Sequence, residues 1–214
     1  MASQYYAPPP PPPRSGVPVW VIAVLGACGG CVLLFAVLIV VGLSVAKESP
    51  AAHQVRAQLF QDQKNYVAAE KEWRLAYKRR RNDPQMLNNY AWCLYLNGKS
   101  AEAIPIAKRA VELSPDPNII DTLAHAYLGA TQLDKAKIEF ENALQQNPTL
   151  GASLDGMGQV YEAKKDYKKA YDFYLKAKKS GQDIDGLNER VQQMRRRVKI
   201  TELIQSPIRD QIHR

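Results

Sequence analysis

Small and apolar residues recur through most of the chain with a period of 33 or 34 residues. Four alanines mark this period, and a second alanine follows each of them seven residues later. These two columns are Ala69, Ala103, Ala136 and Ala170, and Ala76, Ala110, Ala143 and Ala177. Three further columns keep the same step: Ala57, Ala91, Ala124 and Gly158; Phe60, Leu94, Tyr127 and Tyr161; and Trp73, Ala107, Phe140 and Tyr174. Five columns in step over four copies indicate an internal repeat.

The pattern within one copy predicts two helices. In the third copy, residues 120–127 place apolar side chains at the i, i+3, i+4 and i+7 spacing of one helix face. A break follows at residues 129–132, and Ala136, Phe140 and Ala143 then mark the buried side of a second helix. The Asp-Pro pairs at 83–84 and 116–117 have the chemistry of a helix start.

This pattern resembles the tetratricopeptide repeat, whose period is about 34 residues. The resemblance rests on the small-residue columns, the aromatic residues, and Pro115 and Pro148, which close two copies. It covers residues 50–183 and implies four repeats, at 50–83, 84–116, 117–150 and 151–183. The fold that it implies is all-α, a right-handed α–α superhelix in which each repeat contacts its neighbours.

The residues after the fourth copy predict one further amphipathic helix over 184–204. Its apolar positions recur every three or four residues and are Ile184, Leu187, Val191, Met194 and Val198. The opposite face is basic and carries Arg190, Arg195, Arg196, Arg197 and Lys199. Helical-repeat arrays need a terminal helix with one polar face. We therefore expect a capping helix whose basic face meets water, followed by a frayed tail at 205–214.

A continuous apolar segment precedes the repeats. Residues 17–46 hold 24 apolar residues out of 30, and no charged residue lies between Arg14 and Lys47. Since about 20 apolar residues cross a bilayer as a helix, the segment predicts a single transmembrane helix. A cleaved signal peptide is one alternative, although its apolar stretch is only about 7–15 residues long. A bacterial lipoprotein signal is the other, because Leu25-Gly26-Ala27-Cys28 resembles a lipobox, although the apolar run continues beyond it.

Small residues lie along one face of this predicted helix. Gly26 and Gly30 form a GxxxG pair, and small residues of this kind let two membrane helices approach closely. The pair predicts a homodimer through the membrane helix, whereas simple enrichment of glycine in such helices predicts a monomer.

The first 16 residues form a proline-rich arm with an uninterrupted proline run from Pro8 to Pro13. Proline fixes φ and removes the amide donor, so the run predicts a polyproline II rod. It serves either as a spacer, which we favour, or as a ligand for an aromatic groove. For the orientation, we expect a bacterial plasma membrane protein with this arm in the cytoplasm and the repeats outside, because the short arm with Arg14 is easier to retain than to translocate.

Composition narrows the classes of function. The 214 residues include 29 Lys and Arg against 21 Asp and Glu, a formal net charge of +8. The three cysteines exclude a disulfide scaffold, because two of them lie inside the apolar segment. The three histidines are far apart in the repeat frame, and neither a nucleophile motif nor a glycine-rich phosphate loop occurs. We therefore expect no enzymatic activity, no cofactor and no metal site.

The resemblance implies that the first helices of the repeats line a concave groove. Transferred by repeat position, the groove residues are Asn88, Asn89, Trp92, Tyr95, Asp121, Thr122, His125, Asp155, Gln159 and Glu162. The function implied is that of a membrane-anchored scaffold that docks a partner protein or peptide there. The alternative is electrostatic attachment to anionic lipid or nucleic acid through the basic patch Arg195, Arg196 and Arg197, with nucleic acid the less favoured ligand.

Overall fold

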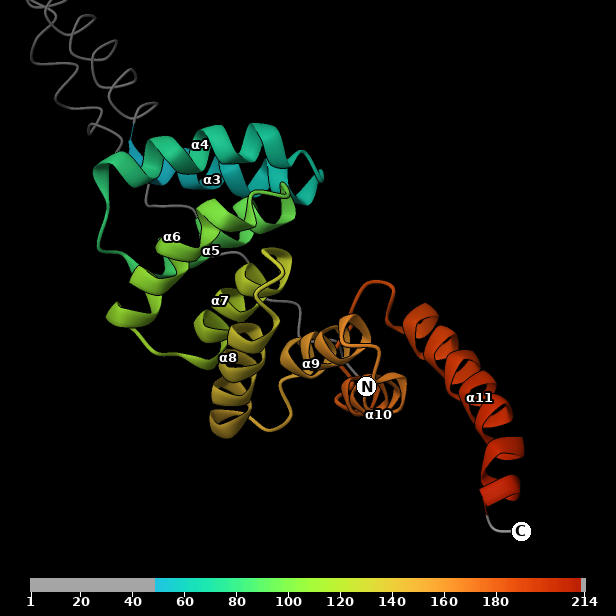
Figure 1. Ribbon diagram of the computed structural model, residues 1–214. Coiled ribbons are helices and arrows are strands. Elements are labelled where there is room, and N and C mark those ends of the chain that lie inside the picture. The colour runs from blue at the N-terminus through green and yellow to red at the C-terminus, as the bar shows by residue number, and fades with distance from the viewer. Residues whose placement is uncertain (1–48, 213–214) are drawn as a thin grey trace, which may run out of the picture. The chain divides into compact units, whose positions relative to one another are not determined.

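Four pairs of α-helices and one long final helix make up residues 49–212, the part of the chain that the computed structural model describes (Figure 1). Side chains are described for residues 49–201. The helices are α3 (Pro50–Asp62), α4 (Tyr66–Arg79), α5 (Pro84–Leu96), α6 (Ser100–Leu113), α7 (Pro117–Gly129), α8 (Leu133–Gln146), α9 (Gly151–Ala163), α10 (Tyr167–Lys179) and α11 (Leu187–Ile212). Residues 49–212 contain no β-strand.

The first helices of three pairs begin with a polar capping residue followed by proline. The side chains of Ser49, Asp83 and Asp116 accept hydrogen bonds from backbone amides in the first turns of α3, α5 and α7. A proline follows each capping residue. Proline is tolerated there because the first backbone amides of a helix have no acceptor within the helix, so the N–H that proline lacks is not needed. The helix starts predicted from the Asp-Pro pairs at 83–84 and 116–117 are therefore confirmed.

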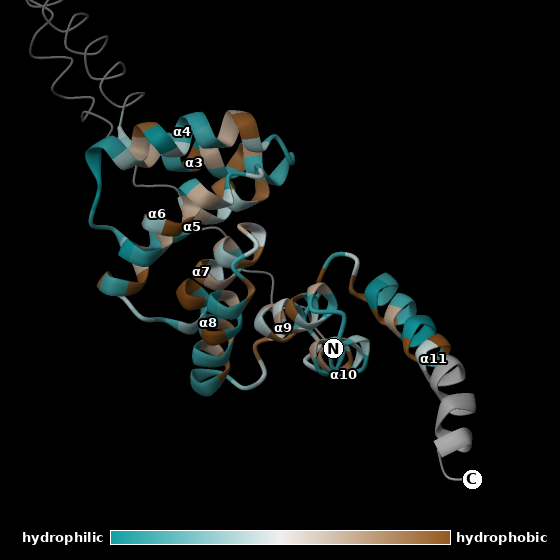
Figure 2. Cartoon of the chain, viewed as in Figure 1, coloured by the Kyte–Doolittle hydropathy of each residue, from teal (hydrophilic) through white to brown (hydrophobic). Residues whose placement is uncertain are grey.

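The periodic columns form the core of this helical array. All eight alanines of the two main columns have no exposed surface. Trp73, Phe140 and Tyr174, which recur in step with them, are at most 2% exposed. Small residues let the two helices of a pair approach, and the large rings fill the space between them. Figure 2 shows hydrophobic and hydrophilic residues alternating along the helices, for example along α4 and α8.

Two glycines of α9 give the fourth unit a closer packing than its neighbours. A methyl group added to Gly156 would collide with the ring of Phe140, and one added to Gly158 would collide with the ring of Tyr174. The equivalents of Gly158 in the earlier units are alanines. The fourth unit therefore brings α9 and its aromatic neighbours together at a distance that excludes even a Cβ atom.

A buried carboxylate ties the first unit to the second. Glu70 of α4 is 4% exposed and accepts hydrogen bonds from Asn97 and Lys99 in the turn after α5, at 2.6 and 2.8 Å. Arg74, one turn later on α4, completes the set at 2.5 Å. Burial raises the pKa of Glu70, but the hydrogen bonds from Lys99 and Asn97 and the nearby positive charges outweigh it, so the pKa is lowered. The charge is thus compensated by partners from both units.

The final helix begins and ends at other residues than the sequence predicted. Helix α11 starts at Leu187 and continues to Ile212, through the region expected to be a frayed tail. Pro207 lies inside this helix. A proline removes one backbone hydrogen bond but does not always end a helix. Leu187, Val191 and Met194 are buried as expected, and α11 packs against α10.

The predicted transmembrane helix over 17–46, the pair Gly26 and Gly30, and the proline-rich arm over 1–16 all lie outside the described residues. Among the helices that are described, none is both long enough and apolar enough to cross a membrane.

Candidate binding site on the first helices

The first helices of the last three pairs lie in a row, because α5 packs against α7 and α7 packs against α9. These three helices carry the ten residues predicted for the groove, and we name the side on which they gather the first-helix face. Five of the ten are partly exposed: Asn89, Trp92, Tyr95, Gln159 and Glu162. The other five are buried: Asn88, Asp121, Thr122, His125 and Asp155.

Aromatic rings from two helices meet on this face. The ring centroids of Trp92 and Tyr95 on α5 are 5.1 Å apart, and each lies 5.3 Å from the ring centroid of His125 on α7. On its other side, His125 packs edge-on against Phe140 of α8, with 5.0 Å between centroids. His125 therefore connects a partly exposed aromatic pair to a fully buried core ring.

Asp121 lies one helical turn before His125 and is 7% exposed. Ser153 of α9 donates a hydrogen bond to Asp121 Oδ1 at 2.5 Å, and His125 Nε2 lies 3.7 Å from Oδ2. Burial raises the pKa of the Asp121 carboxyl, although His125 and Ser153 act in the opposite direction. We name Trp92, Tyr95, Asp121 and His125 the aromatic–acid cluster.

Two carboxyl groups lie close to the phenol of Tyr95. Burial is the main cause that raises the pKa of the Tyr95 phenol, and the carboxylates of Asp155 and Asp121 raise it further. Arg190 acts in the opposite direction. Both carboxyl groups are therefore close enough to Tyr95 to oppose the negative charge that its phenol would gain on losing a proton.

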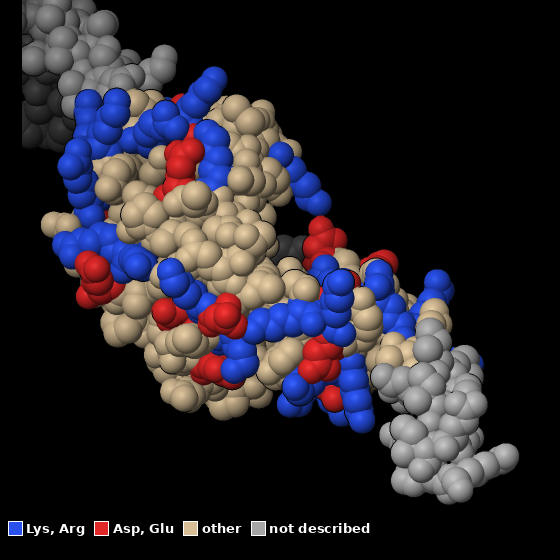
Figure 3. All heavy atoms as spheres, viewed as in Figure 1, with Lys and Arg blue, Asp and Glu red and all other residues tan. Residues whose placement is uncertain are grey.

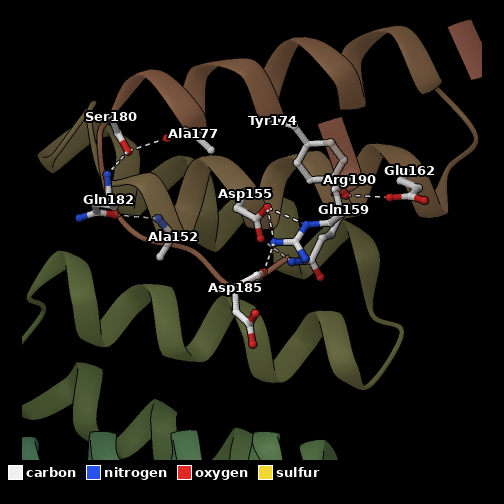
Figure 4. Close-up of polar contacts among 10 residues, drawn as sticks. All are labelled: Ala152, Asp155, Gln159, Glu162, Tyr174, Ala177, Ser180, Gln182, Asp185 and Arg190. Atoms are coloured by element: carbon white, nitrogen blue, oxygen red, sulfur yellow. Dashed lines mark hydrogen bonds and ion pairs between the residues drawn. The ribbon is translucent and has the colours of Figure 1, made fainter. Parts of the chain in front are cut away.

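Asp155 of α9 binds a guanidinium group from the final helix (Figure 4). Arg190 Nε and one terminal nitrogen lie 3.0 and 2.9 Å from Asp155 Oδ1, and the backbone oxygen of Asp185 accepts from the same side chain at 3.0 Å. Gln159 donates to the second carboxylate oxygen of Asp155 at 2.7 Å. The guanidinium also lies 5.7 Å from the ring centroid of Tyr174. A carboxylate, a carbonyl and an aromatic face together form a complete guanidinium site.

Two further predicted residues make contacts within the fold. Glu162 accepts a hydrogen bond from the hydroxyl of Tyr174 at 2.7 Å, across α9 and α10. Thr122 donates to the backbone oxygen of Asn118, one turn earlier on α7, at 3.2 Å.

The structure corrects the expectation that every predicted groove residue faces outward. Asp121, Thr122 and Asp155 are buried and bonded within the fold, and His125 is buried between aromatic rings. The repeat position of a residue determines on which side of its helix the side chain lies. It does not determine how far the side chain is buried, because neighbouring helices cover part of that side. Asn89, Trp92, Tyr95, Gln159 and Glu162 remain partly accessible.

Arg190 and Ser153 are contributors that sequence reasoning missed. Arg190 was expected on the water-facing side of the capping helix, but it points back to α9 and is bonded to Asp155 (Figure 4). One available signal was the position of Arg190 just 35 residues after Asp155, which places it near the same point of a fifth repeat. The hydroxyl of Ser153 carried no signal, because serine is common on helices of every kind.

The basic patch lies on the exposed side of α11. Arg195, Arg196 and Arg197 are exposed, and Arg197 covers the ring of Tyr167 at 5.0 Å from its centroid. Figure 3 shows Lys and Arg side chains over much of the viewed face, with Asp and Glu between them. In contrast to this basic surface, the first-helix face contains the buried carboxyl groups of Asp121 and Asp155, of which Asp155 is paired with Arg190.

Within the described residues, no group of three or more His, Cys, Asp or Glu side chains could hold a metal ion. Cys93 on α5 is fully buried, and burial raises the pKa of its thiol to about 12. This thiol is consequently a core side chain rather than a nucleophile.

Sequence comparison identifies the repeat. The tetratricopeptide repeat family matches this chain over residues 55–116 and again over residues 152–180. Over 55 residues, the chain is 40% identical to anaphase-promoting complex subunit 3 of Schizosaccharomyces pombe. That match covers 26% of this chain but only 8% of the length of the curated relative.

Solved structures share the fold. A thermophilic TPR protein of Thermus thermophilus matches with a TM-score of 0.62 and 18% identity, over 68% of this chain and 81% of its own. MamA of Desulfovibrio magneticus matches with a TM-score of 0.56 and 20% identity, over 65% and 80%. YrrB, described as a TPR protein with an unusual peptide-binding site, matches with a TM-score of 0.56 and 19% identity, over 71% and 78%. The predicted tetratricopeptide repeats and the all-α solenoid are thereby confirmed.

Proposed function

We propose that this chain is a membrane-anchored scaffold that docks a partner protein or peptide on its first-helix face. Tetratricopeptide-repeat proteins generally mediate protein–protein interactions, and nothing in the described residues indicates an enzyme. The observation that carries the docking proposal is the partly exposed pair Trp92 and Tyr95, with their rings 5.1 Å apart. Large aromatic side chains of this kind supply much of the binding energy at protein interfaces.

The membrane part of the proposal rests on the sequence. Residues 17–46 hold 24 apolar residues out of 30 without a charge, which is enough to cross a bilayer once. We further propose a cytoplasmic N-terminus and repeats outside a bacterial plasma membrane, because the short arm with Arg14 is easier to retain than to translocate. In this arrangement the repeats hold a partner close to the bilayer.

Alkaline extraction and protease digestion test the anchor and its orientation. We expect the full chain to stay in the membrane pellet in sodium carbonate, and a deletion of residues 17–46 to release it. Release of the intact chain would refute the anchor. Protease added to intact cells should digest the repeats, whereas protection until lysis would reverse the proposed orientation. Labelling of Cys93 is unsuitable for this purpose, because its buried thiol is unreactive.

Crosslinking tests the docking surface. We expect that Trp92→Ala combined with Asn89→Ala lowers the recovery of a crosslinked partner from membranes by about tenfold or more, because truncating an aromatic hot spot costs about 2 kcal/mol or more. The measurement is quantitative mass spectrometry of proteins that co-purify with the full chain after crosslinking in cells.

Two comparison variants make this test decisive. Ile138→Ala removes an exposed apolar side chain from the second helix of the third pair and should leave recovery unchanged. Neutralising Arg195, Arg196 and Arg197 to glutamine tests electrostatic attachment through the basic patch. Unchanged recovery with the Trp92 and Asn89 variant, together with loss in the arginine variant and at high salt, would replace docking by that alternative.

A further inference from the structure

Two carboxylates occupy the same repeat position on neighbouring first helices, and they differ in their cationic partners. Asp121 on α7 and Asp155 on α9 are 34 residues apart, one repeat length. Asp155 holds the guanidinium of Arg190 from α11 at 2.9 and 3.0 Å. Within the described residues, no Lys or Arg side chain forms an ion pair with Asp121, whose charged neighbour is His125 at 3.7 Å. This part of the chain therefore contains one filled guanidinium site and one equivalent carboxylate without a Lys or Arg partner.

The helices α5 and α7, which pack against each other, also contain two buried polar atoms without a hydrogen-bond partner. Asn88 Oδ1 and His125 Nδ1 are buried and have no hydrogen-bond partner among the described residues, although the two residues are only 9% and 5% exposed. In the tautomer that carries the proton on Nε2, the nitrogen that lies 3.7 Å from Asp121, His125 Nδ1 is an acceptor. Buried polar atoms in folded proteins are nearly always paired, so these two unpaired atoms on the facing helices α5 and α7 indicate a missing partner.

The same place offers an aromatic surface for a cation. Asn88, Trp92 and Tyr95 lie on one side of α5 at i, i+4 and i+7. The rings of Trp92 and Tyr95 pack against the ring of His125 on α7. Trp92 is the best aromatic partner for a cation, and both rings are partly exposed. Elsewhere in this chain, Lys and Arg side chains cover Tyr127, Tyr161, Phe173 and Tyr167 at 4.9–5.9 Å.

We propose that the aromatic–acid cluster binds an arginine side chain of the docked partner, against the rings of Trp92 and Tyr95 and paired with Asp121. The partner segment is therefore basic at this point, which deepens the proposed function and rests on it. The guanidinium has several N–H donors and a flat face, which match the carboxylate, the unpaired acceptors and the aromatic pair at once. Arg190 on Asp155 shows the same chemistry one repeat further along.

The indole signal of Trp92 provides a direct test. The full chain in detergent micelles, labelled with 15N at the indoles of its three tryptophans, is titrated with the peptide acetyl-Gly-Gly-Arg-Gly-Gly-amide. We expect a saturable shift of the Trp92 indole resonance, assigned with Trp92→Phe. The resonance of Trp73 should stay unchanged, because this indole is buried and bonded to Gln61. The peptide with citrulline in place of arginine, which keeps the shape without the charge, should shift Trp92 at least about tenfold less.

Substitutions at the cluster identify the site. Asp121→Asn should weaken binding of the arginine peptide by about tenfold or more, because it removes the carboxylate of a charge-assisted pair. Asp134→Asn, an exposed carboxylate on α8 that pairs with Lys164, is the matched control and should bind normally. If Asp121→Asn does not fold, Tyr95→Leu gives the second variant, since it removes one ring and keeps the Trp92 signal.

The outcomes separate this inference from the proposed function. Equal shifts with the arginine and citrulline peptides, or unchanged binding by Asp121→Asn, would overturn the arginine site. If partner recovery still depends on Trp92 and Asn89 in that case, docking on the first-helix face stands without it. If the arginine peptide binds as expected but partner recovery ignores Trp92 and Asn89, the cluster binds cations and the docking proposal fails.

Discussion

Replacement of Phe140 by alanine is expected to lower the free energy of unfolding by about 3–5 kcal/mol, the range for truncating a buried aromatic ring. Phe140 is completely buried, touches the ring of His125 at 5.0 Å between centroids, and lies directly against Gly156. It therefore connects the third unit to the first helix of the fourth. The measurement is urea unfolding of the full chain in detergent, followed by the helical circular dichroism signal.

A control on the same helix separates this effect from loss of any apolar side chain. Ile138→Ala also truncates an apolar residue of α8, but Ile138 is 54% exposed and the expected change is below about 1 kcal/mol. A loss of similar size in both variants would contradict the central role of Phe140.

The contact with Gly156 makes the Phe140 position sensitive to added volume as well. Gly156→Ala alone should lower stability by about 1–3 kcal/mol, since overpacking against the ring outweighs the helix propensity that alanine gains. With Phe140→Leu in the same chain, the added methyl has more space, so the two losses should sum to more than the loss of the double variant. Strict additivity would show that the two residues do not press on each other.

Replacement of Arg190 by alanine is expected to lower stability by about 2–4 kcal/mol, because it leaves the buried carboxylate of Asp155 without its cation. This loss of stability is smaller than that for breaking a completely buried ion pair, because the side chain of Arg190 is 25% exposed and only that of Asp155, at 5%, is buried. Gln159 remains as a donor to Asp155 but brings no charge. Hydrogen exchange should show the largest increase in α11 and in the facing part of α9.

Removing the charge of Asp155 should restore part of the loss. Asp155→Asn combined with Arg190→Ala is expected to be more stable than Arg190→Ala alone, because the double variant has no unpaired buried carboxylate. Arg195→Ala provides the matched control on the same helix, where the side chain is exposed and the expected change is below about 0.5 kcal/mol. Equal effects of Arg190→Ala and Arg195→Ala would mean that the ion pair does not hold α11 in place.

Much of the fold could be predicted from the sequence because each repeat has the same helices, the same buried positions and the same packing against its neighbour. The alanine columns predicted which sides of the helices are buried, and these alanines have no exposed surface. The Asp-Pro pairs predicted where α5 and α7 begin, since capping chemistry depends on neighbouring residues alone. Local rules of this kind do not need the tertiary structure.

The candidate site was less predictable because burial depends on residues far away in the sequence. Asp121 and Asp155 were expected to face a ligand, but Ser153 and Arg190, 32 and 35 residues later, bond to them inside the fold. The side of a helix follows from its period, whereas the depth of a side chain depends on how closely the next helix packs. Trp92 and Tyr95, at the edge of the same face, remained partly exposed.

Gly158 has a consequence for anyone who would reuse this chain as a building block. The other three units carry alanine at the equivalent position, so a consensus unit drawn from all four would contain a methyl group that the ring of Tyr174 does not admit. Tyr174 in turn is bonded through its hydroxyl to Glu162 on the same helix as Gly158, which ties the ring to this position. Gly158, Glu162 and Tyr174 therefore depend on one another and would have to be transferred together. A consensus sequence of the four units would separate them.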